Sequence, residues 1–199
     1  MDKKILAHLS KDPIMAKVVA GTPLEMRHAP HDPYFSLIRA IVFQQLSGKA
    51  AETIHNRFLS LFEGGYPHPD QLMNMEMETL RSAGLSRQKG TYVQNVAAFF
   101  EEHKLLEKDW ETLTDEYLLK TLTQIKGVGQ WTVEMLLMFT LNRPDILPVD
   151  DLGIQQAIQR LYGVEEKGKQ LQRRMLEIAE PWRPYRTYAS LYLWRWKDQ

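Results

Sequence analysis

Apolar residues recur along this chain at intervals of three and four positions, which is the spacing of a helix that buries one face. Residues 33–46, PYFSLIRAIVFQQL, show the pattern clearly. Asp12-Pro13 and Asp32-Pro33 each put a capping side chain before a proline, whose fixed φ and missing N–H suit the first position of a helix. Alternation of apolar and polar residues over the length of a strand is absent from the sequence. The pattern therefore predicts an all-α protein.

Glycine and proline separate the helical stretches. They occur, for example, at Gly64, Gly84, Gly163 and Pro181, where a helix is expected to end. Residues 114–116, a threonine followed by two acids, are typical of the cap and first turn of another helix. The spacing of these signals predicts roughly ten helices joined by short loops. Since no repeat or low-complexity linker is visible, we expect any subdomains to be packed together.

Charge is balanced over the whole chain but uneven along it. The 199 residues contain 25 lysines and arginines and 25 aspartates and glutamates, and this zero net charge argues against a strongly basic nucleic-acid-binding protein. Acids dominate residues 101–116, whereas bases dominate from residue 152 onward. The C-terminal part is compatible with a basic surface and equally with a solvated helix face of mixed charge.

Several classes of site are excluded or disfavoured. The sequence has no cysteine, which excludes disulfides, iron–sulfur clusters and thiolate zinc sites. His28 and His31 are separated by a proline and lack an obvious acidic partner, so we expect no zinc there. No apolar run reaches the roughly 18 residues that span a bilayer, and the N-terminus lacks a signal-peptide pattern. We therefore expect a cytoplasmic protein without membrane contact.

Residues 125–137, IKGVGQWTVEMLL, combine a glycine-flanked turn with an apolar helix. Gly127 and Gly129 are expected to permit a tight turn with positive φ, and Gln130 and Thr132 to open the next helix. Successive backbone N–H groups beside a helix N-terminus can bind phosphate. The pattern favours a helix-hairpin-helix motif that holds the DNA backbone without reading its sequence. The alternative is a purely structural αα-hairpin.

Two adjacent carboxylates, Asp150 and Asp151, precede the apolar helix that starts at Leu152. Either one can cap this helix, because paired acids at a helix start complement the macrodipole. Either one can also serve as a catalytic carboxylate, and their spacing alone leaves both interpretations open.

The sequence resembles a known family in five blocks that lie in order over most of the chain. They are RAIVFQQLSGKAAETI at 39–54, GLSRQKGTYVQNVA at 84–97, KGVGQWT at 126–132, LPVDDLGI at 147–154 and PWRPYRTYASLYLWRW at 181–196. Together they resemble the helix-hairpin-helix (HhH-GPD) superfamily of DNA glycosylases, and within it the 3-methyladenine DNA glycosylase II branch. The chain resembles the short form, which lacks an N-terminal β-rich domain.

The resemblance implies a fold and a domain organisation. Residues 1–199 would form a single HhH-GPD unit with two lobes, one at about 33–142 and the other formed by about 1–32 and 143–199. A cleft between the lobes would contain Asp151, the hairpin and the tryptophans. We expect a monomer that acts on double-stranded DNA in the nucleoid.

The resemblance also implies a reaction, the hydrolysis of the N-glycosidic bond of alkylated purines of the 3-methyladenine and 7-methylguanine type. The base would be flipped out of duplex DNA, and an abasic site would remain for base-excision repair. By resemblance Asp151 is the catalytic residue, and Asp150 is the cap or an orienting neighbour. No catalytic cofactor or metal is implied, although the hairpin carbonyls of this family can hold a structural monovalent cation.

Trp131 bears on whether the enzyme would also cut the strand. In bifunctional relatives a lysine occupies this position and forms a Schiff base with the sugar, so tryptophan implies a monofunctional glycosylase without AP-lyase activity. Trp131 and Trp194 match positions near the flipped base, where an aromatic ring would attract a cationic purine. Alternatively, both tryptophans belong to the core, because each has apolar neighbours at helical spacing.

A flipped base leaves a gap in the duplex, which by resemblance is filled from the loop at Gln45, Leu46 and Ser47. Leu46 could act as an apolar wedge, whereas Ser47 could simply cap the following helix. Two other functions remain open. One is a non-enzymatic helix-hairpin-helix module that binds DNA, and the other is a glycosylase for a different lesion.

Overall fold

The computed structural model describes residues 2–24 and 32–199, which contain twelve α-helices and no strand. The prediction of an all-α fold is confirmed. The number of helices exceeds the expected ten because three of them, α5 (Pro69–Met73), α6 (Met77–Ser82) and α9 (Gln130–Met135), have only five or six residues. Helices this short carry too few apolar repeats to be separated by periodicity alone.

The contacts divide the chain into two compact units. Unit 1 comprises Met1–Ala29 and Leu137–Gln199, and unit 2 comprises Pro30–Leu136. The sequence-based division assigned residues 137–142 to the other lobe. In the structure they belong to unit 1, where the backbone N–H of Arg143 donates to the Leu137 carbonyl at 2.8 Å and Phe139 stacks on Trp194.

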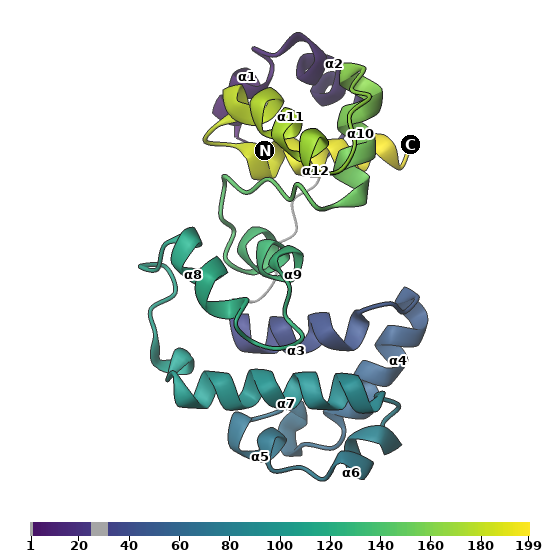
Figure 1. The fold of residues 1–199 in the computed structure, drawn as a ribbon, viewed down its shortest axis with the longest axis vertical. Helices are drawn as coiled ribbons and strands as arrows, with labels where there is room; N and C mark the ends of the chain where they lie inside the picture. Colours follow the sequence, from purple (N-terminus) through teal and green to yellow (C-terminus); the bar gives the residue numbers. More distant parts are fainter. Residues whose placement is uncertain (1, 25–31) are drawn as a thin grey trace. The chain divides into compact units, whose positions relative to one another are not determined.

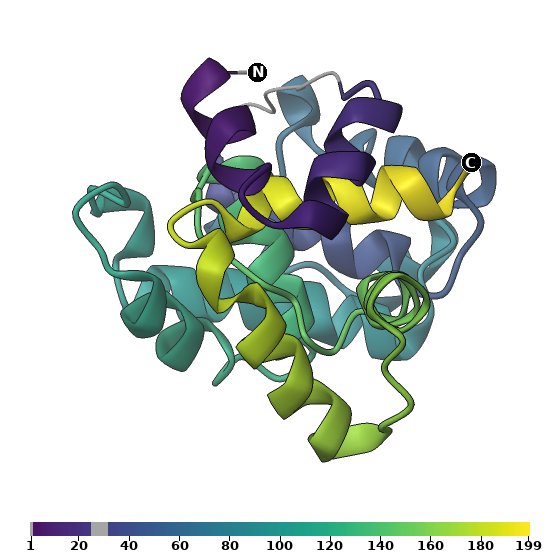
Figure 2. The ribbon, with the colours of Figure 1, turned by 90° about the horizontal axis from the view of Figure 1, so that it is seen from above.

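Unit 1 brings the two ends of the chain together. Its helices are α1 (Lys3–Leu9), α2 (Pro13–Gly21), α10 (Leu152–Tyr162), α11 (Gly168–Ala179) and α12 (Arg186–Lys197). Helix α12 packs against α10 and α2, which are all labelled in Figure 1, and Figure 2 shows α2 passing in front of α12. The core includes Leu9, Ile154, Met175 and Leu193, all fully buried. Because α12 contacts both partners, its side chains can support the residues at the start of α10.

Unit 2 is organised around α7 (Arg87–Glu102), its longest helix. The other helices are α3 (Pro33–Phe43), α4 (Gly48–Leu59), α5, α6, α8 (Asp115–Leu122) and α9. Helix α7 packs against α3, α5 and α6, and Figure 1 shows it between α3 and this pair. Short 3₁₀ turns occur at Glu63–Gly65 and Leu105–Glu107. The α7 face toward this core contains Val93, Val96 and Phe100.

The chain passes from α9 directly into a π-helix at Leu136–Thr140, which crosses the boundary between the units. π-helical turns are rare and occur frequently at functional sites. In the described part of the chain, none of the helices has the length and apolar character needed to cross a membrane.

Candidate functional site: an acid site and a hairpin

Asp151 is the N-cap residue of α10 and carries the candidate catalytic carboxylate. Its backbone is extended, with φ −73° and ψ 119°, and its Oδ1 accepts a hydrogen bond of 2.9 Å from the N–H of Ile154. The same oxygen accepts a bond of 2.7 Å from the indole Nε1–H of Trp194. A helix N-terminus and an indole donor both stabilise a negative charge. The two hydrogen bonds therefore hold the carboxylate in a fixed orientation.

Asp150 has a different environment from Asp151. Its Oδ1 accepts a hydrogen bond from the side-chain amide of Gln172, and the contact is exposed. The expectation that Asp150 could be the cap is wrong, because the residue immediately before the first helical position, Leu152, is Asp151. Nothing in this geometry assigns a separate orienting role to Asp150.

Gly153 explains how Trp194 reaches Asp151. A Cβ at this position would lie 2.9 Å from Cδ1 of Trp194, 3.1 Å from its Nε1 and 3.0 Å from Oδ1 of Asp151. Real Cβ atoms essentially never come within 3.0 Å of another heavy atom and rarely within 3.4 Å, so a larger residue would displace the indole or the carboxylate. The glycine in DLGI is therefore part of the site, and sequence reasoning had not singled it out.

The segment before Asp151 is fastened to the start of α12. Arg186 donates from Nε to Oδ1 of Asp145 at 2.7 Å and from Nη2 to the Asp145 carbonyl at 2.8 Å. The hydroxyl of Thr187 donates to the Arg143 carbonyl at 2.6 Å and accepts from the N–H of Ile146 at 3.0 Å. These bonds join the loop leading to Asp151 and the helix carrying Trp194 into one framework.

Two exposed apolar residues lie beside this framework and were missed from the sequence. Phe139 stacks on Trp194 with ring centroids 6.0 Å apart, yet 39% of it is exposed. Leu152 follows Asp151 directly and is 69% exposed. Both follow a helical apolar pattern, so only their exposure in the folded chain separates them from core residues.

The predicted hairpin lies in unit 2, between α8 and α9. Gly127 adopts φ +108°, and a Cβ there would lie 2.3 Å from Cγ of Tyr92. Val128 and Ile125 are buried, and the N–H of Val128 donates to the Ile125 carbonyl at 3.0 Å. Gly127 is thus required both by its backbone conformation and by the ring packed against it.

Gly129 corrects the prediction that both glycines need positive φ. It is the N-cap of α9 with φ −90°, and a Cβ there would meet nothing within 4 Å. Gly129 and Gln130 are exposed, while Thr132 is buried at 6% exposure. Gln130 donates from Nε2 to Oε1 of Glu134 at 2.9 Å. The open space at Gly129 is compatible with close approach of another molecule to the backbone, and the phosphate contact stays a prediction.

Trp131 is the second residue of α9, beside the hairpin, and is 44% exposed. The alternative that it belongs to the core is therefore wrong, because core residues of unit 2 such as Val133 are fully buried. Trp194 belongs to unit 1 and is partly buried. That both rings touch a flipped base, and that they share one cleft with Asp151, stays a prediction.

The predicted wedge loop, Gln45–Ser47, connects α3 to α4. Gln45 has a positive φ of 58°, which a glutamine adopts rarely, and Leu46 is 38% exposed. Ser47 occupies the N-cap position of α4, but its side chain makes no capping hydrogen bond. The structure therefore presents Leu46 on the surface of a sharply turned loop, and its insertion into DNA stays a prediction.

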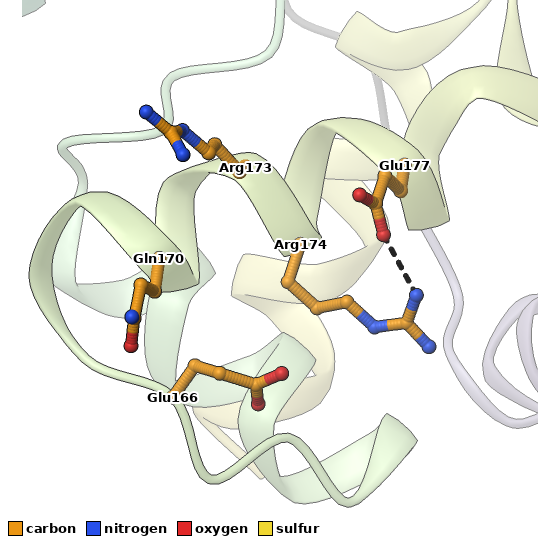
Figure 3. A pocket seen from close by; sticks show the side chains of 5 residues that line it. All are labelled: Glu166, Gln170, Arg173, Arg174 and Glu177. Atoms are coloured by element: carbon orange, nitrogen blue, oxygen red, sulfur yellow. Dashed lines mark hydrogen bonds and ion pairs between the residues drawn. The ribbon is translucent and has the colours of Figure 1, made fainter.

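The charged C-terminal part forms a mixed surface on α11. A shallow polar hollow of about 520 Å³ is lined by Glu166, Gln170, Arg173, Arg174 and Glu177. Figure 3 shows Arg174 reaching Glu177 on the same helix, and their 2.8 Å ion pair neutralises part of the basic charge. Of the two interpretations left open above, this geometry favours the solvated face of mixed charge.

His28 and His31 lie outside the described residues, so the expectation about zinc there is untouched. Among residues 2–24 and 32–199, no group of three or more histidine, aspartate or glutamate side chains could hold a metal ion. At the hairpin, the carbonyls of Lys126 and Gly127 accept hydrogen bonds from Asn95 and Gln44. The cation at the hairpin stays a prediction.

Comparison with known proteins decides the family. Residues 38–184, more than half of the chain, match the HhH-GPD superfamily of base excision DNA repair proteins. The chain belongs to this superfamily. The HhH-GPD match begins in α3 and ends just before α12, so it includes the wedge loop, the hairpin and Asp151.

Several relatives of this HhH-GPD protein are named as 3-methyladenine DNA glycosylases. It is 40% identical over 166 residues to DNA-3-methyladenine glycosylase 1 of Schizosaccharomyces pombe, covering 82% of this chain and 72% of the relative. The structure of Schizosaccharomyces pombe 3-methyladenine DNA glycosylase in complex with abasic DNA matches with a TM-score of 0.81 and 36% identity, over 96% of this chain and 95% of that chain. A DNA-3-methyladenine glycosidase from Bacillus halodurans matches with a TM-score of 0.85 and 34% identity, over 98% and 89%. The resemblance to the 3-methyladenine glycosylase branch is confirmed.

Proposed function

We propose that this protein is a monofunctional DNA glycosylase that hydrolyses the N-glycosidic bond of alkylated purines in duplex DNA. The observation that carries the proposal is the anchored carboxylate of Asp151, held by Trp194 and the start of α10 in an HhH-GPD chain. Relatives named 3-methyladenine DNA glycosylases support the substrate class, purines of the 3-methyladenine and 7-methylguanine type. The abasic DNA bound by one of these relatives supports an abasic site as the product.

The chemistry suits a single carboxylate. Alkylation makes the purine cationic, so its bond to the sugar can break without a strong general acid. The bonding electrons leave with the base and cancel its positive charge, while positive charge develops on the sugar ring. The anionic Asp151 stabilises this oxocarbenium-like state electrostatically. A water then forms the new bond to the C1′ carbon and gives its proton to the carboxylate, so Asp151 also serves as general base.

Trp131 supports hydrolysis without strand cleavage. An AP-lyase step needs an amine that forms a Schiff base with the sugar. The position that carries this lysine in bifunctional relatives is Trp131 here, and its indole cannot perform that reaction. The expected product is therefore an intact abasic site in an unbroken strand. This role for the position rests on the family resemblance.

Recognition of the base would use ring faces rather than the indole donor of Trp194, which is already bonded to Asp151. A cationic purine between or against aromatic rings gains about 0.5–2 kcal/mol from the cation–π contact, depending on desolvation. The hairpin from Gly127 to Thr132 would hold the DNA backbone, and Gln45, Leu46 and Ser47 would fill the gap left by the flipped base. The alternative function, a non-enzymatic DNA-binding module, does not explain the bonded pair of Asp151 and Trp194.

The remaining features of the proposal follow from this reaction. It needs no catalytic cofactor, and a monovalent cation at the hairpin carbonyls would be structural. One enzyme molecule acts on one lesion, so we propose a monomer. Its substrate is chromosomal DNA, and we propose a cytoplasmic, nucleoid-associated protein. Each of these points is independent of the test of the chemistry.

The test compares release of free 3-methyladenine and 7-methylguanine from methylated duplex DNA by the wild-type protein and Asp151→Asn. Asparagine is an equally good N-cap, and its oxygen can accept the bonds from Ile154 and Trp194, so the variant should fold and bind DNA. Single-turnover release should fall by about 10³-fold, because only the charge and the base are lost.

Asp150→Asn is the matched control and should change release by about twofold or less, because Asp150 is exposed and its bond to Gln172 lies on the surface. Strand breaks formed by the wild-type protein without heat or alkali would contradict the monofunctional assignment. If the wild-type protein binds methylated DNA but releases no base of any kind, the binding module becomes the better description.

A further inference from the structure

Gln44 connects two loops of unit 2 that are far apart in the sequence. It is the C-cap of α3 and the residue immediately before the wedge loop, Gln45–Ser47. Its side chain is partly buried, and Nε2 donates a hydrogen bond of 3.3 Å to the carbonyl of Gly127, the first glycine of the hairpin. The two bonded residues are 83 positions apart. This bond links the residue that precedes the predicted DNA wedge to the predicted DNA-backbone clamp.

The wedge loop starts from a rigid helix end. The N–H of Gln44 donates to the carbonyls of Ala40 and Ile41, at 3.1 and 3.3 Å, and the N–H of Leu46 donates to the carbonyl of Phe43 at 3.3 Å. The carbonyl of Val42 accepts a bond of 2.7 Å from Lys89. The last four carbonyls of α3, which a helix normally leaves without partners, are all bonded here. The end of α3, from which the wedge loop starts, is therefore fully hydrogen-bonded.

Helix α7, which runs alongside α3 in Figure 1, contacts both the end of α3 and the hairpin. Lys89, Tyr92 and Asn95 lie three residues apart, so they follow one side of the helix. Lys89 bonds the end of α3, Tyr92 packs against Gly127, and Asn95 donates to the Lys126 carbonyl at 3.1 Å. Partial burial lowers the pKa of Lys89. Helix α7 thus holds the end of α3 through Lys89 and the hairpin through Tyr92 and Asn95, while Gln44 bonds the end of α3 to the hairpin directly.

We propose that Gln44 is a positioning residue that couples the wedge loop to the hairpin, so that gripping the backbone and inserting Leu46 occur as one event. The inference rests on the proposed function, because it assumes that Leu46 enters a duplex whose base has been flipped. A loop held in its inserted geometry before DNA arrives loses less conformational entropy on insertion. Coupling therefore accelerates base flipping and leaves ground-state DNA affinity nearly unchanged.

Gln44→Met tests the proposal, because methionine has a similar shape and lacks the amide donor. Single-turnover excision of a paired lesion should fall about fivefold, the typical effect of one neutral hydrogen bond, while the Kd for DNA and its salt dependence stay within about twofold. A mispaired base flips more easily, so for the same lesion in a mispair the excision rate of Gln44→Met should approach that of the wild-type protein. Gln44→Glu, which keeps the shape and also removes the donor, should act in the same direction.

The decisive measurement is a double-mutant cycle with Leu46→Ala. If Gln44 acts through the wedge, Gln44→Met has no further effect once Leu46 is removed, whereas independent residues give additive effects. Asn95→Leu is the matched control, because it removes a donor from the neighbouring hairpin carbonyl without touching the wedge loop. It should leave the preference between paired and mispaired lesions unchanged. Additive effects in the cycle, or the same paired-lesion defect in Asn95→Leu, would overturn the coupling.

A second readout separates this inference from the proposed function. Fluorescence of 2-aminopurine opposite an abasic analogue reports unstacking by the wedge and requires no chemistry. If the wild-type protein releases no base, the proposed function fails, yet the same cycle can be completed in fluorescence amplitude. If Gln44→Met gives the same fluorescence amplitude as the wild-type protein, the coupling is overturned, even if the wild-type protein excises the base as proposed.

Discussion

The candidate site of unit 1 is formed by side chains, whereas that of unit 2 is formed by the backbone. In unit 1 the site consists of side chains bonded to one another, with Trp194 donating to Asp151 at 2.7 Å. In unit 2 the hairpin consists of backbone, shaped by Gly127 at φ +108°. Each site depends on a glycine. Gly153 makes room for the Trp194 indole, whereas Gly127 makes room for Tyr92 and also adopts a conformation that other residues avoid.

The difference indicates how each site should respond to substitution. A side-chain site can lose its chemistry while the fold survives, because an altered side chain still occupies its position. A backbone site can lose its function only when the local fold changes, because main-chain N–H groups are present in every residue other than proline. Substitutions in unit 1 should therefore be able to lower activity without lowering stability, whereas in unit 2 a loss of function should come with a loss of stability.

Gly127→Ala should have the largest effect on stability. A left-handed backbone costs an alanine about 1–2 kcal/mol, and the clash with Tyr92 adds about 1–3 kcal/mol. Together these predict a loss of about 2–5 kcal/mol in the free energy of unfolding, measured by urea denaturation, with weaker DNA binding in parallel.

Gly129→Ala is the matched control for the hairpin. It meets no neighbouring atom and has an ordinary φ of −90°, so its stability should change by about 1 kcal/mol or less. If DNA affinity nevertheless falls, the phosphate approaches the backbone at Gly129. Equal stability losses in the two variants would contradict the distinction between the glycines.

Trp194→Phe should have a smaller effect, confined to catalysis. Phenylalanine keeps a ring for packing and removes the indole donor to Asp151. A hydrogen bond to a charged group contributes about 1.5–3 kcal/mol, so single-turnover excision should fall about 10- to 100-fold with DNA affinity retained. Trp196→Phe, the same change two residues further along α12, should lower the rate about twofold or less. An unchanged rate in Trp194→Phe would exclude a role for the indole bond.

Acidification should affect the two units in different pH ranges. In unit 2, His55 is 5% exposed between the rings of Phe35 and Phe43, and burial, with a smaller effect of Arg39, lowers its pKa below the ordinary 6.5. The folded state then binds fewer protons than the unfolded state, so stability falls as the pH drops below about 6.5.

In unit 1, burial would raise the pKa of Asp12, but hydrogen bonds from two side chains and two backbone N–H groups outweigh it and hold the pKa below 3.8. This contribution is present above pH 3.8 and is lost only at lower pH. Unit-resolved hydrogen exchange at pH values of about 7 and about 5.5 should show unit 2 opening first on acidification. His55→Leu should remove this difference, and unit 1 opening first in the wild-type protein would contradict it.

Much of the fold was accessible from local signals in the sequence. The Asp-Pro pairs at Asp12 and Asp32 do cap α2 and α3, and Gly163 adopts the left-handed conformation at the end of α10. Such signals act over one turn of chain, so they can be read without tertiary information. The prediction of a positive φ at Gly129 was wrong, because a glycine beside a turn does not by itself show the sign of its φ.

The candidate site was accessible only in part. The motif resemblance pointed to Asp151, Trp131 and the hairpin. It could not show which aspartate caps α10, because this depends on which residue is the first of the helix. Phe139 and Leu152 have the apolar character of core residues, and only their exposure distinguishes them. Gly153 carries no signal of its own, since its importance comes from Trp194, which lies far along the chain.

The sequence by itself therefore determined the helical class, several helix ends such as those at Asp12, Asp32 and Gly163, the hairpin and the family to which the chain belongs. These properties follow from neighbouring residues, whose periodicity and turn chemistry act locally. The tertiary structure alone decided that Trp194 bonds to Asp151, that Tyr92 enforces glycine at position 127, and that Gln44 joins the wedge loop to the hairpin. Such contacts join distant segments, and packing, rather than local preference, selects them.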